Sequence, residues 1–273
     1  MTIMDAASCA ALMPALTTTA VRTALLVRGL AGKGDVHRKR DGSPVTEADL
    51  AAEAAIRSDL ARLAPALPLV SEEQAEDHAP PAGSGGSYAL VDPLDGTREF
   101  IAGRDEYAIN IAILAAGRPL LGIVAAPALG LLWRGIVGRG AERIIFAADG
   151  GLSPPQPIHS RKPAPEDLVV VVSRSHLDER TQAYIAKLPG ARMMACGSAV
   201  KFGRVAEGTA DLYPRLAPVR DWDAAAGHAL VEAAGGRIAT PKGHSLRYGT
   251  AERVIDGFIA CGDRAAPPAS SPA

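Results

Sequence analysis

The spacing of apolar residues changes along the chain and predicts different elements in different parts. Between residues 12 and 27, Leu, Ala and Val recur every three or four positions, which predicts an amphipathic helix that ends near Gly29 and packs against a sheet. The polar segment 32–43 holds the charge run from His37 to Arg40, which is typical of a solvated loop. Thr46 to Asp49 has the form of a capping box, with Asp in place of the usual Glu or Gln. A second helix is therefore expected to begin there.

The apolar runs that follow are short and are separated by turn residues, which is typical of strands. Five strands are predicted, the last three of them forming an antiparallel meander, over residues 67–70, 88–91, 107–114, 120–126 and 131–137. Asn110 lies in one of these apolar runs and is expected to be a buried amide with hydrogen-bond partners. The segment 77–87, rich in Pro, Gly and Ser, predicts a mobile loop. Residues 1–152 are thus expected to form an α+β half with two long helices and an antiparallel sheet.

The second half of the chain shows a different pattern. Five prolines between residues 153 and 167 predict a connection without regular structure. Leu168 to Val172 is continuously apolar and largely β-branched, as in buried parallel strands, and helical and strand-like patterns then alternate. Residues 168–264 are therefore expected to form an α/β half with a mostly parallel sheet and flanking helices. The final segment, 265–273, contains only Ala, Pro and Ser and is expected to be a disordered tail.

Composition and charge narrow the function. A net charge of −1 over 273 residues, with no basic stripe, argues against nonspecific nucleic-acid binding and favours a small phosphorylated ligand. Three cysteines without Cys-x-x-Cys spacing support neither a disulfide framework nor a thiolate metal site. Residues 1–30 have no basic region before their apolar residues, and no apolar run approaches the roughly 20 residues of a membrane span. We expect a cytoplasmic protein, monomer or homodimer, and leave peripheral association with the inner face of the cell membrane open.

The candidate chemistry centres on the string Asp92-Pro93-Leu94-Asp95-Gly96-Thr97. Pro93 is expected to end the preceding strand, and Gly96 permits a tight turn into a helix. Asp92 and Asp95 can converge across this turn, where their mutual repulsion requires hard metal ions. The N–H groups of Gly96 and Thr97 would open the helix and favour a phosphate. The alternative is that Asp92 caps a strand end and Asp95 is an ordinary helix N-cap.

The string resembles the signature of the inositol monophosphatase superfamily of metal-dependent, lithium-sensitive phosphatases. Its extension through Glu99-Phe100 is similar to the 3′(2′),5′-bisphosphate nucleotidase (CysQ-type) branch. The resemblance implies a layered α-β-α-β-α sandwich with the site in a cleft between the two halves. It also implies two or three Mg²⁺ ions, held by Glu72, Asp92, Asp95, Asp223 and the carbonyl of Leu94. Glu72 matches the first residue of the family's Glu-Glu pair, and Asp223 matches the Asp of its Trp-Asp-x-Ala-Ala-Gly motif.

The same resemblance implies roles in the reaction. Asp49 would hydrogen-bond Thr97, and together they would activate the attacking water, although helix capping remains the alternative for Asp49. Lys39 would reach the phosphate, and Glu73 would support Glu72. The predicted substrate contacts in this region also include Leu94, Asp95, Gly96 and Asp223.

Segments of the second half complete the predicted site. Ser173-Arg174-Ser175-His176 follows a buried strand and resembles the nucleotidase branch, and Cys196 to Lys201 reads as a strand, a glycine turn and a helix. In the alternative, purely structural interpretation, Ser198 and Asp223 are helix N-caps. Asp221 is expected either at the surface or behind the predicted metal ligands. Tyr213-Pro214-Arg215 carries Arg where inositol monophosphatases have an acid.

Lys201 likewise replaces an apolar residue of those enzymes. Two additional cations suit a second phosphate, or a ribose and base, better than a neutral polyol. Together with these cations, the resemblance implies Mg²⁺-dependent hydrolysis of adenosine 3′,5′-bisphosphate to AMP, with the 3′-phosphorylated sulfuryl donor as a further substrate, in sulfur assimilation. The rest of the nucleotide would be held by His176, Gly197, Ser198, Lys201 and Arg215. The alternatives are an inositol or sugar monophosphatase and a non-catalytic regulatory relative.

Overall fold

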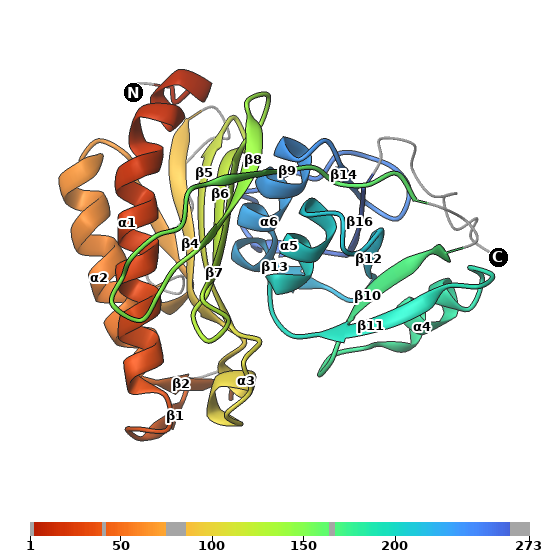
Figure 1. Ribbon diagram of the computed structural model, residues 1–273, viewed down its shortest axis with the longest axis horizontal. Coiled ribbons are helices and arrows are strands. Elements are labelled where there is room, and N and C mark those ends of the chain that lie inside the picture. Colours follow the sequence, from red (N-terminus) through yellow and green to blue (C-terminus); the bar gives the residue numbers. More distant parts are fainter. Residues whose placement is uncertain (1–2, 40–41, 75–85, 164–166, 263–273) are drawn as a thin grey trace.

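The protein is a stack of helical and sheet layers in the order α-β-α-β-α, as predicted (Figure 1). The computed structural model describes residues 3–39, 42–74, 86–163 and 167–262. The outer helices α1 (Ala6–Leu30) and α2 (Glu47–Leu63) cover one face of the first sheet. Between the two sheets lie α5 (Val200–Ala206) and α6 (Asp221–Ala233), and α4 (Glu179–Ile185) covers the far face of the second sheet.

The first sheet has seven strands in the order β3-β4-β5-β6-β7-β8-β9. β3 is parallel to β4 and every other neighbouring pair is antiparallel, so the predicted meander is confirmed. The strands are β3 (Leu69–Ser71), β4 (Ser87–Asp95), β5 (Ala108–Ala115), β6 (Arg118–Ala126), β7 (Leu131–Ile136), β8 (Gly140–Ile145) and β9 (Gln156–Ile158). Because successive side chains of a strand point to opposite faces, each strand contributes to two hydrophobic cores, one on each face of the sheet. In β4, Ala89 and Val91 face α1 and α2, whereas Leu90 faces α6.

Strand β4 does not end at Pro93, so that prediction is wrong. The strand continues to Asp95, and its register against β5 shifts between Asp92 and Asp95. Such a bulge leaves residues outside the ladder, which accommodates a proline that has no N–H to donate. The bulge therefore sets the spacing of the two aspartates.

Two other expectations of irregular structure are also wrong. In the polar segment 32–43, β1 (Val36–Arg38) pairs with β2 (Pro44–Thr46), although β1 is exposed as expected for a charge run. The predicted proline-rich connection 153–167 contains β9, an edge strand, where a proline is tolerated. Of the predicted mobile loop, 77–85 lies outside the described residues, as does the predicted tail 265–273.

The second sheet has the order β11-β10-β12-β16-β14. Its strands are β11 (Arg192–Cys196), β10 (Val169–Ser173), β12 (Leu212–Arg215), β16 (Phe258–Cys261) and β14 (Arg237–Ala239). β16 is antiparallel to both of its neighbours, and the other pairs are parallel. Four strands therefore run in one direction, which agrees with the predicted mostly parallel sheet. A small separate sheet joins β13 (Val219–Arg220) to β15 (Val254–Ile255).

Helix α6 is held close to the first sheet by glycines. A Cβ on Gly122 of β6 would lie 2.1 Å from the carbonyl oxygen of Ala226, and one on Gly227 would lie 2.1 Å from the ring of Phe202. Any side chain at either position would push α6 away from the sheet or from α5. These contacts fix the place of α6, whose first turn carries Asp223, against the first sheet and α5.

Helix α1 is long and apolar enough to cross a membrane, judged by length and composition alone, contrary to the expectation that no segment approaches a span. In this structure 50% of its apolar stretch is buried. Leu16, Ala20 and Ala24 are fully buried in the core between the helices and the first sheet. Here α1 therefore serves as a covering helix of the sandwich.

Candidate active site

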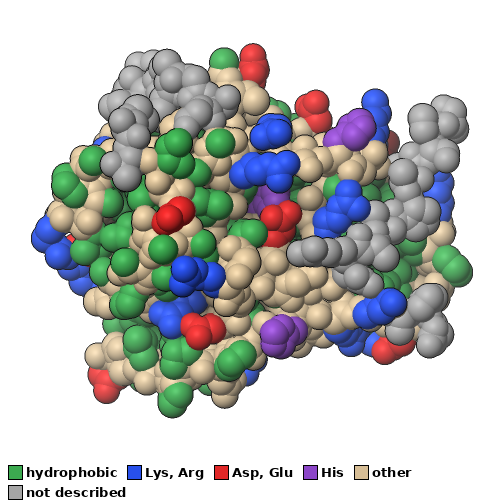
Figure 2. Space-filling view, turned by 90° about the horizontal axis from the view of Figure 1, so that it is seen from above, with side chains coloured by type: hydrophobic (Ala, Val, Ile, Leu, Met, Phe, Trp, Pro, Cys, Tyr) green, Lys and Arg blue, Asp and Glu red, His purple; other side chains and the backbone are tan. Residues whose placement is uncertain are grey.

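A pocket of about 320 Å³ lies between the two halves of the chain. The first half contributes the end of β4 and the short helix α3 (Thr97–Ile101), and the second half contributes the ends of β10 and β12 with α5 and α6. Its wall includes most of the predicted site residues, namely Glu72, Asp92, Leu94, Asp95, Gly96, Thr97, His176, Ser198, Lys201, Arg215 and Asp223. Charged side chains of both signs are scattered over the face of the protein shown in Figure 2 and do not form one basic stripe there.

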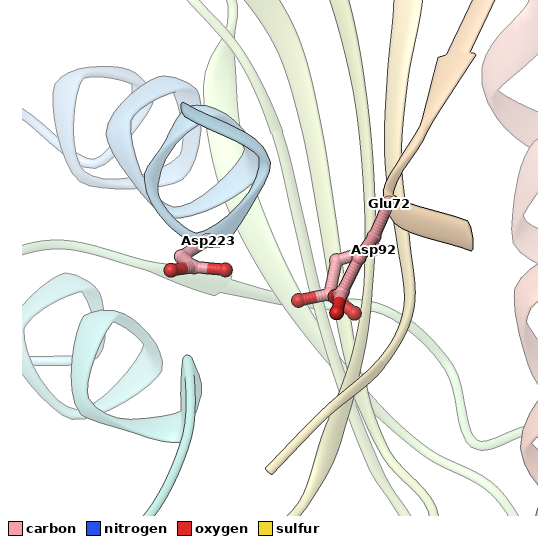
Figure 3. A group of neighbouring side chains, drawn as sticks. All are labelled: Glu72, Asp92 and Asp223. Atoms are coloured by element: carbon pink, nitrogen blue, oxygen red, sulfur yellow. The ribbon is translucent and has the colours of Figure 1, made fainter. Parts of the chain in front are cut away.

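Three carboxylates converge at one corner of this pocket (Figure 3). Glu72 stands in the turn η1 (Glu72–Gln74) after β3, Asp92 on β4 and Asp223 on the first turn of α6. One oxygen of each lies within 4.8 Å of one oxygen of each of the others. This spacing can hold a metal ion, and the convergence of Glu72 and Asp223 on Asp92 is what the predicted site requires.

Asp95 has a different environment from these three. Its Oδ2 accepts hydrogen bonds from the hydroxyl of Ser198 (2.8 Å) and the N–H of Ala199 (2.6 Å), both from the second half. Asp95 therefore joins the two halves of the chain at the pocket. Its place among the metal ligands stays a prediction.

Burial and mutual repulsion define the electrostatics of the corner. Burial first, and then the neighbouring carboxylates, raise the pKa values of Asp92 and Asp223 well above those of ordinary aspartates. Burial also raises the pKa of Glu72, against the opposing effect of the Lys39 ammonium. Without a cation, such a cluster retains protons. An all-oxygen set of this kind fits a hard cation such as Mg²⁺.

The pH dependence of stability should reveal the cost of burying carboxylates beside this corner. Burial raises the pKa of Glu73 from 4.5 to about 7, despite the hydrogen bond from Lys39. A carboxyl with a raised folded-state pKa stabilises the fold while protonated, so this contribution is complete below pH 4.5 and is lost as the pH rises through about 7. We expect urea unfolding in EDTA to show a loss of about 3 kcal/mol between about pH 4.5 and pH 8. Added Mg²⁺ should reverse the loss, and equal stability at both pH values would contradict the expectation.

Asp49 is held in place by its own helix and by the signature loop. Its Oδ2 accepts the Thr46 N–H (2.7 Å) and hydroxyl (2.6 Å), so the predicted capping box is present. Its Oδ1 lies 3.1 Å from the Thr97 hydroxyl, which is also 3.2 Å from the carbonyl oxygen of Leu94. The capping interpretation and the predicted bond to Thr97 are therefore both correct. Asp49 is 1% exposed and does not line the pocket, but its hydrogen bond with Thr97 connects it to the pocket wall.

Lys39 lies against the glutamates. Its Nζ is 2.6 Å from an oxygen of Glu72 and 2.8 Å from one of Glu73. Burial opposes its charge, but the two carboxylates outweigh burial and raise its pKa. Lys39 does not line the pocket described above, so its contact with a phosphate stays a prediction.

Cationic groups of the second half line the opposite wall. Lys201 is 3% exposed and donates to the carbonyl oxygens of Ser198 and Cys196, with its ammonium 5.2 Å from the ring centre of Tyr213. Burial lowers its pKa, and nearby carboxylates oppose this effect. Arg215 donates to the carbonyl oxygen of His176 (3.0 Å).

The imidazole of His176 lies 3.2 Å from the guanidinium of Arg98. Burial, followed by Arg215 and Arg98, lowers the pKa of His176, which favours the neutral ring. Gly197 differs from the other predicted contacts because its N–H donates to Glu106 (2.9 Å) and it does not line the pocket.

Local capping predictions fail at both motif helices of the second half. Ser198 is not an N-cap, since α5 begins after Ala199, and Ser198 has φ 53°. Asp223 is the third residue of α6, and its side chain accepts the N–H of Arg220 (3.1 Å). Asp221 is 2% exposed, so of its two predicted places the surface is wrong, and a place behind the ligands stays a prediction.

Asn110 is buried as predicted, but the prediction that its amide has partners is wrong. It is 1% exposed, and neither its Oδ1 nor its Nδ2 has a hydrogen-bond partner. It stands directly opposite Asp92 in the pairing of β4 with β5. A buried amide without partners destabilises the fold.

Replacing Asn110 by Leu should therefore stabilise the metal-free protein by about 1–2 kcal/mol, because two unsatisfied polar atoms are removed. Replacing it by Asp should have the opposite effect, since it adds another carboxylate beside Asp92. Chemical denaturation in EDTA measures both changes. A loss of stability in Asn110→Leu would show that the amide is bonded in solution, for example to water.

Three of the contributors to the site that sequence reasoning missed are charged. Arg98 and Glu99 line the pocket, and Glu106 binds Gly197 behind it. The string Glu99-Phe100 was noted only for its resemblance. Nothing local to Glu106 identifies a partner that lies 91 residues away.

Comparison with known proteins places this geometry in a family. The inositol monophosphatase family model matches residues 10–261. The chain belongs to the inositol monophosphatase family. It is 39% identical over 226 residues to the 3′(2′),5′-bisphosphate nucleotidase CysQ of Salmonella typhimurium, covering 81% of this chain and 86% of that protein.

Solved structures of the family have the same fold. CysQ from Bacteroides thetaiotaomicron, described as a bacterial member of the inositol monophosphatase family, superposes with a TM-score of 0.79 at 30% identity, covering 94% of this chain and 98% of that one. The IMPase of Thermotoga maritima superposes with a TM-score of 0.73 at 23% identity over 92% of each chain. The predicted fold class and family are therefore confirmed.

Proposed function

We propose that the protein is a Mg²⁺-dependent 3′(2′),5′-bisphosphate nucleotidase that hydrolyses adenosine 3′,5′-bisphosphate to AMP and phosphate. The observation that carries this proposal is the pocket, which joins a three-carboxylate corner to a wall containing Lys201, Arg215 and His176. The similarity to CysQ nucleotidases over most of the chain supports the same substrate class.

At the carboxylate corner, Glu72, Asp92 and Asp223 would hold Mg²⁺, with Asp95 and the carbonyl of Leu94 as further ligands. Two or three bound Mg²⁺ ions supply charge neutralisation for the phosphate and a bound water of lowered pKa. Asp92 is the most buried of the three clustered carboxylates, at 1% exposure. Water therefore stabilises its charge least when no cation is bound. The corner therefore favours a cation over an empty, protonated state near neutral pH.

Thr97 would position the attacking water. Its hydroxyl proton points to Asp49 or to the Leu94 carbonyl, so its lone pairs remain to accept a hydrogen bond from a water in the pocket. Asp49 fixes this orientation because its other oxygen is held by Thr46. The N–H groups of Gly96 and Thr97, which line the pocket, would hold the phosphate.

The opposite wall would hold the rest of the nucleotide. Arg215 has a planar donor group suited to a second phosphate, and its Nε is buried without a partner. Ser198 and the neutral ring of His176 provide donors and acceptors for the nucleoside. The predicted contacts of Lys39 and Gly197 need rearrangement of the bonds they make to Glu72, Glu73 and Glu106.

A phosphate-release assay with matched substrates tests the proposal. We expect adenosine 3′,5′-bisphosphate to be hydrolysed with a kcat/KM at least about a hundredfold above that of inositol 1-phosphate, since the latter lacks a partner for the cations of the far wall. EDTA should remove the activity and Mg²⁺ should restore it. Equal or greater activity on inositol 1-phosphate would favour the inositol or sugar monophosphatase. The absence of metal-dependent activity on every substrate would favour a non-catalytic regulatory relative.

A further inference from the structure

The loop between β11 and α5, residues 197–199, has a constrained backbone at the pocket wall. Ser198 adopts the left-handed φ of 53°, which is unfavourable for a residue with a side chain. Gly197 has no room for one, because a Cβ would lie 2.5 Å from the carbonyl oxygen of Glu106. Such a conformation persists only where surrounding contacts hold it. Lys201 holds this loop from within the second half, and Asp95 and Glu106 hold it from the first half of the chain.

Glu106 differs from Asp95 because it also binds a second loop. Its Oε2 accepts the N–H of Gly197 (2.9 Å), and its two oxygens accept from the guanidinium of Arg174 (2.8 and 2.9 Å). Arg174 also donates to the carbonyl oxygen of Ala195 (3.0 Å). One carboxylate thus joins the loops that follow β10 and β11, two neighbouring parallel strands.

The same two loops face the pocket with different residues. His176 lies in the loop after β10, and Ser198 lies in the loop after β11; both line the pocket. Glu106 and Arg174 do not line it, so their influence on a ligand passes through these loops. Burial opposes the charge of Glu106, but Arg174 and the Gly197 N–H lower its pKa. It therefore remains ionised near neutral pH.

We propose that Glu106 is a positioning residue for the nucleoside part of the substrate, fixing the separation of the two loops that carry His176 and Ser198. This inference rests on the proposed nucleotidase function, because it concerns the part of the substrate that lies beyond the hydrolysed phosphate. Among the described residues, Glu106 makes no hydrogen bond or ion pair with Glu72, Asp92, Asp223 or Thr97. The loop after β11 also reaches Asp95, but through the bonds of Ser198 and Ala199, which do not involve the Glu106 carboxylate. Loss of the Glu106 carboxylate should therefore affect nucleotide binding and spare the chemistry at the corner.

The variant Glu106→Gln tests this separation of roles. A glutamine amide has one accepting oxygen, so it cannot accept hydrogen bonds from both Arg174 and Gly197 as the carboxylate does. We expect the KM for adenosine 3′,5′-bisphosphate to rise about tenfold, as for a lost charge-assisted hydrogen bond. We expect kcat to change by less than about twofold, since the groups that activate the water are untouched. Hydrolysis of 4-nitrophenyl phosphate, which has no nucleoside, should keep its kcat/KM within about twofold.

Glu142→Gln is the matched control. Glu142 also accepts two bonds from one arginine, Arg134 (2.9 and 2.7 Å), but it lies on β8 and does not line the pocket. Both variants should lose similar stability in thermal melts, and both should keep the wild-type Mg²⁺ titration of the melting temperature. A merely structural role of Glu106 would give the same KM in both variants and would overturn the inference.

Arg174→Gln decides the question if Glu106→Gln fails to fold. It removes the guanidinium and keeps the Glu106 bond to Gly197, so a rise in KM of about threefold is expected. Arg192→Gln, which breaks an exposed ion pair with Asp167, is its control. If the wild-type protein hydrolyses the bisphosphate and Arg174→Gln leaves the KM unchanged, this inference is wrong and the proposed function still stands. A wild-type protein without that activity overturns the proposed function, and this inference with it.

Discussion

Replacement of Asp92 by Asn is expected to lower kcat/KM for the bisphosphate by more than about a thousandfold, the largest effect of any single change considered for this chain. Asp92 is 1% exposed and is one of the three carboxylates that converge within 4.8 Å. An amide presents one neutral oxygen in place of a charged pair, so the corner loses much of its attraction for Mg²⁺. Phosphate release at saturating Mg²⁺ measures the loss.

The same variant should be more stable than the wild type when metal is removed. Its amide relieves the repulsion that raises the pKa values of Asp92 and Asp223 in the metal-free protein. We therefore expect a higher melting temperature in EDTA and little or no further rise when Mg²⁺ is added. The wild type should show the reverse pattern, a lower melting temperature in EDTA and a clear rise with Mg²⁺.

Asp59→Asn provides the contrast for a buried aspartate outside the site. Asp59 is 7% exposed and accepts from Thr19 (2.7 Å) and Arg22 (2.8 Å), so its replacement should lower stability and leave the Mg²⁺ dependence of turnover unchanged. A variant Asp92→Asn with near-normal rates, or with the full Mg²⁺-induced shift in melting temperature, would exclude the proposed metal corner.

Much of this site was predictable because its residues stand in short, distinctive strings. The signature at 92–97 combines two acids with a proline and a glycine, and such a combination has few purely structural uses. The capping box at 46–49 identifies a helix start from local chemistry alone. Short, continuous apolar runs between turn residues likewise identify five strands of the first sheet, β3 to β7, because one face must meet α6 and the other must meet α1 and α2. The runs at β8 and β9 were not predicted as strands.

What could not be predicted depends on contacts between distant parts of the chain. The glycine turn at 197 is visible in the sequence, but its hydrogen bond to Glu106 arises only when the two halves pack together. Ser198 looks like a helix N-cap, yet its hydroxyl donates to Asp95, 103 residues earlier. Pro93 normally ends a strand, and only the bulge against β5 lets β4 continue past it. In each case tertiary packing outweighed a local preference.

The lack of hydrogen-bond partners at Asn110 also could not be predicted from the local sequence. An amide in an apolar strand is ordinarily expected to find a partner, since an unsatisfied one is costly. Here the position directly across from Asp92 places it beside a group of carboxylates that is arranged for a cation. Unsatisfied polar groups and raised pKa values therefore occur together at this corner. This combination is expected where a site sacrifices stability in order to bind a cation, as we propose for this corner.

Replacement of Thr97 by Val is the second large expected effect, a fall in kcat of about a hundredfold to a thousandfold. Val has nearly the same shape as Thr, so the change removes the hydroxyl that would accept a hydrogen bond from the attacking water. Backbone N–H groups at Gly96 and Thr97 remain, and so do the carboxylates of the corner. The KM for the bisphosphate and the Mg²⁺-induced shift in melting temperature should therefore stay within about twofold of the wild type.

Two further variants separate the loss of the hydroxyl from general damage. Thr97→Ser restores the hydroxyl and should recover kcat to within about tenfold of the wild type. Asp49→Asn should lower kcat as well, because Asp49 orients the Thr97 hydroxyl across 3.1 Å. Since the two residues act as one unit, the double variant should be no slower than Thr97→Val alone. If Thr97→Val kept kcat within threefold of the wild type, or if the two losses added in full, the water would have to be positioned by another group, and the proposed role of the Asp49–Thr97 pair would be wrong.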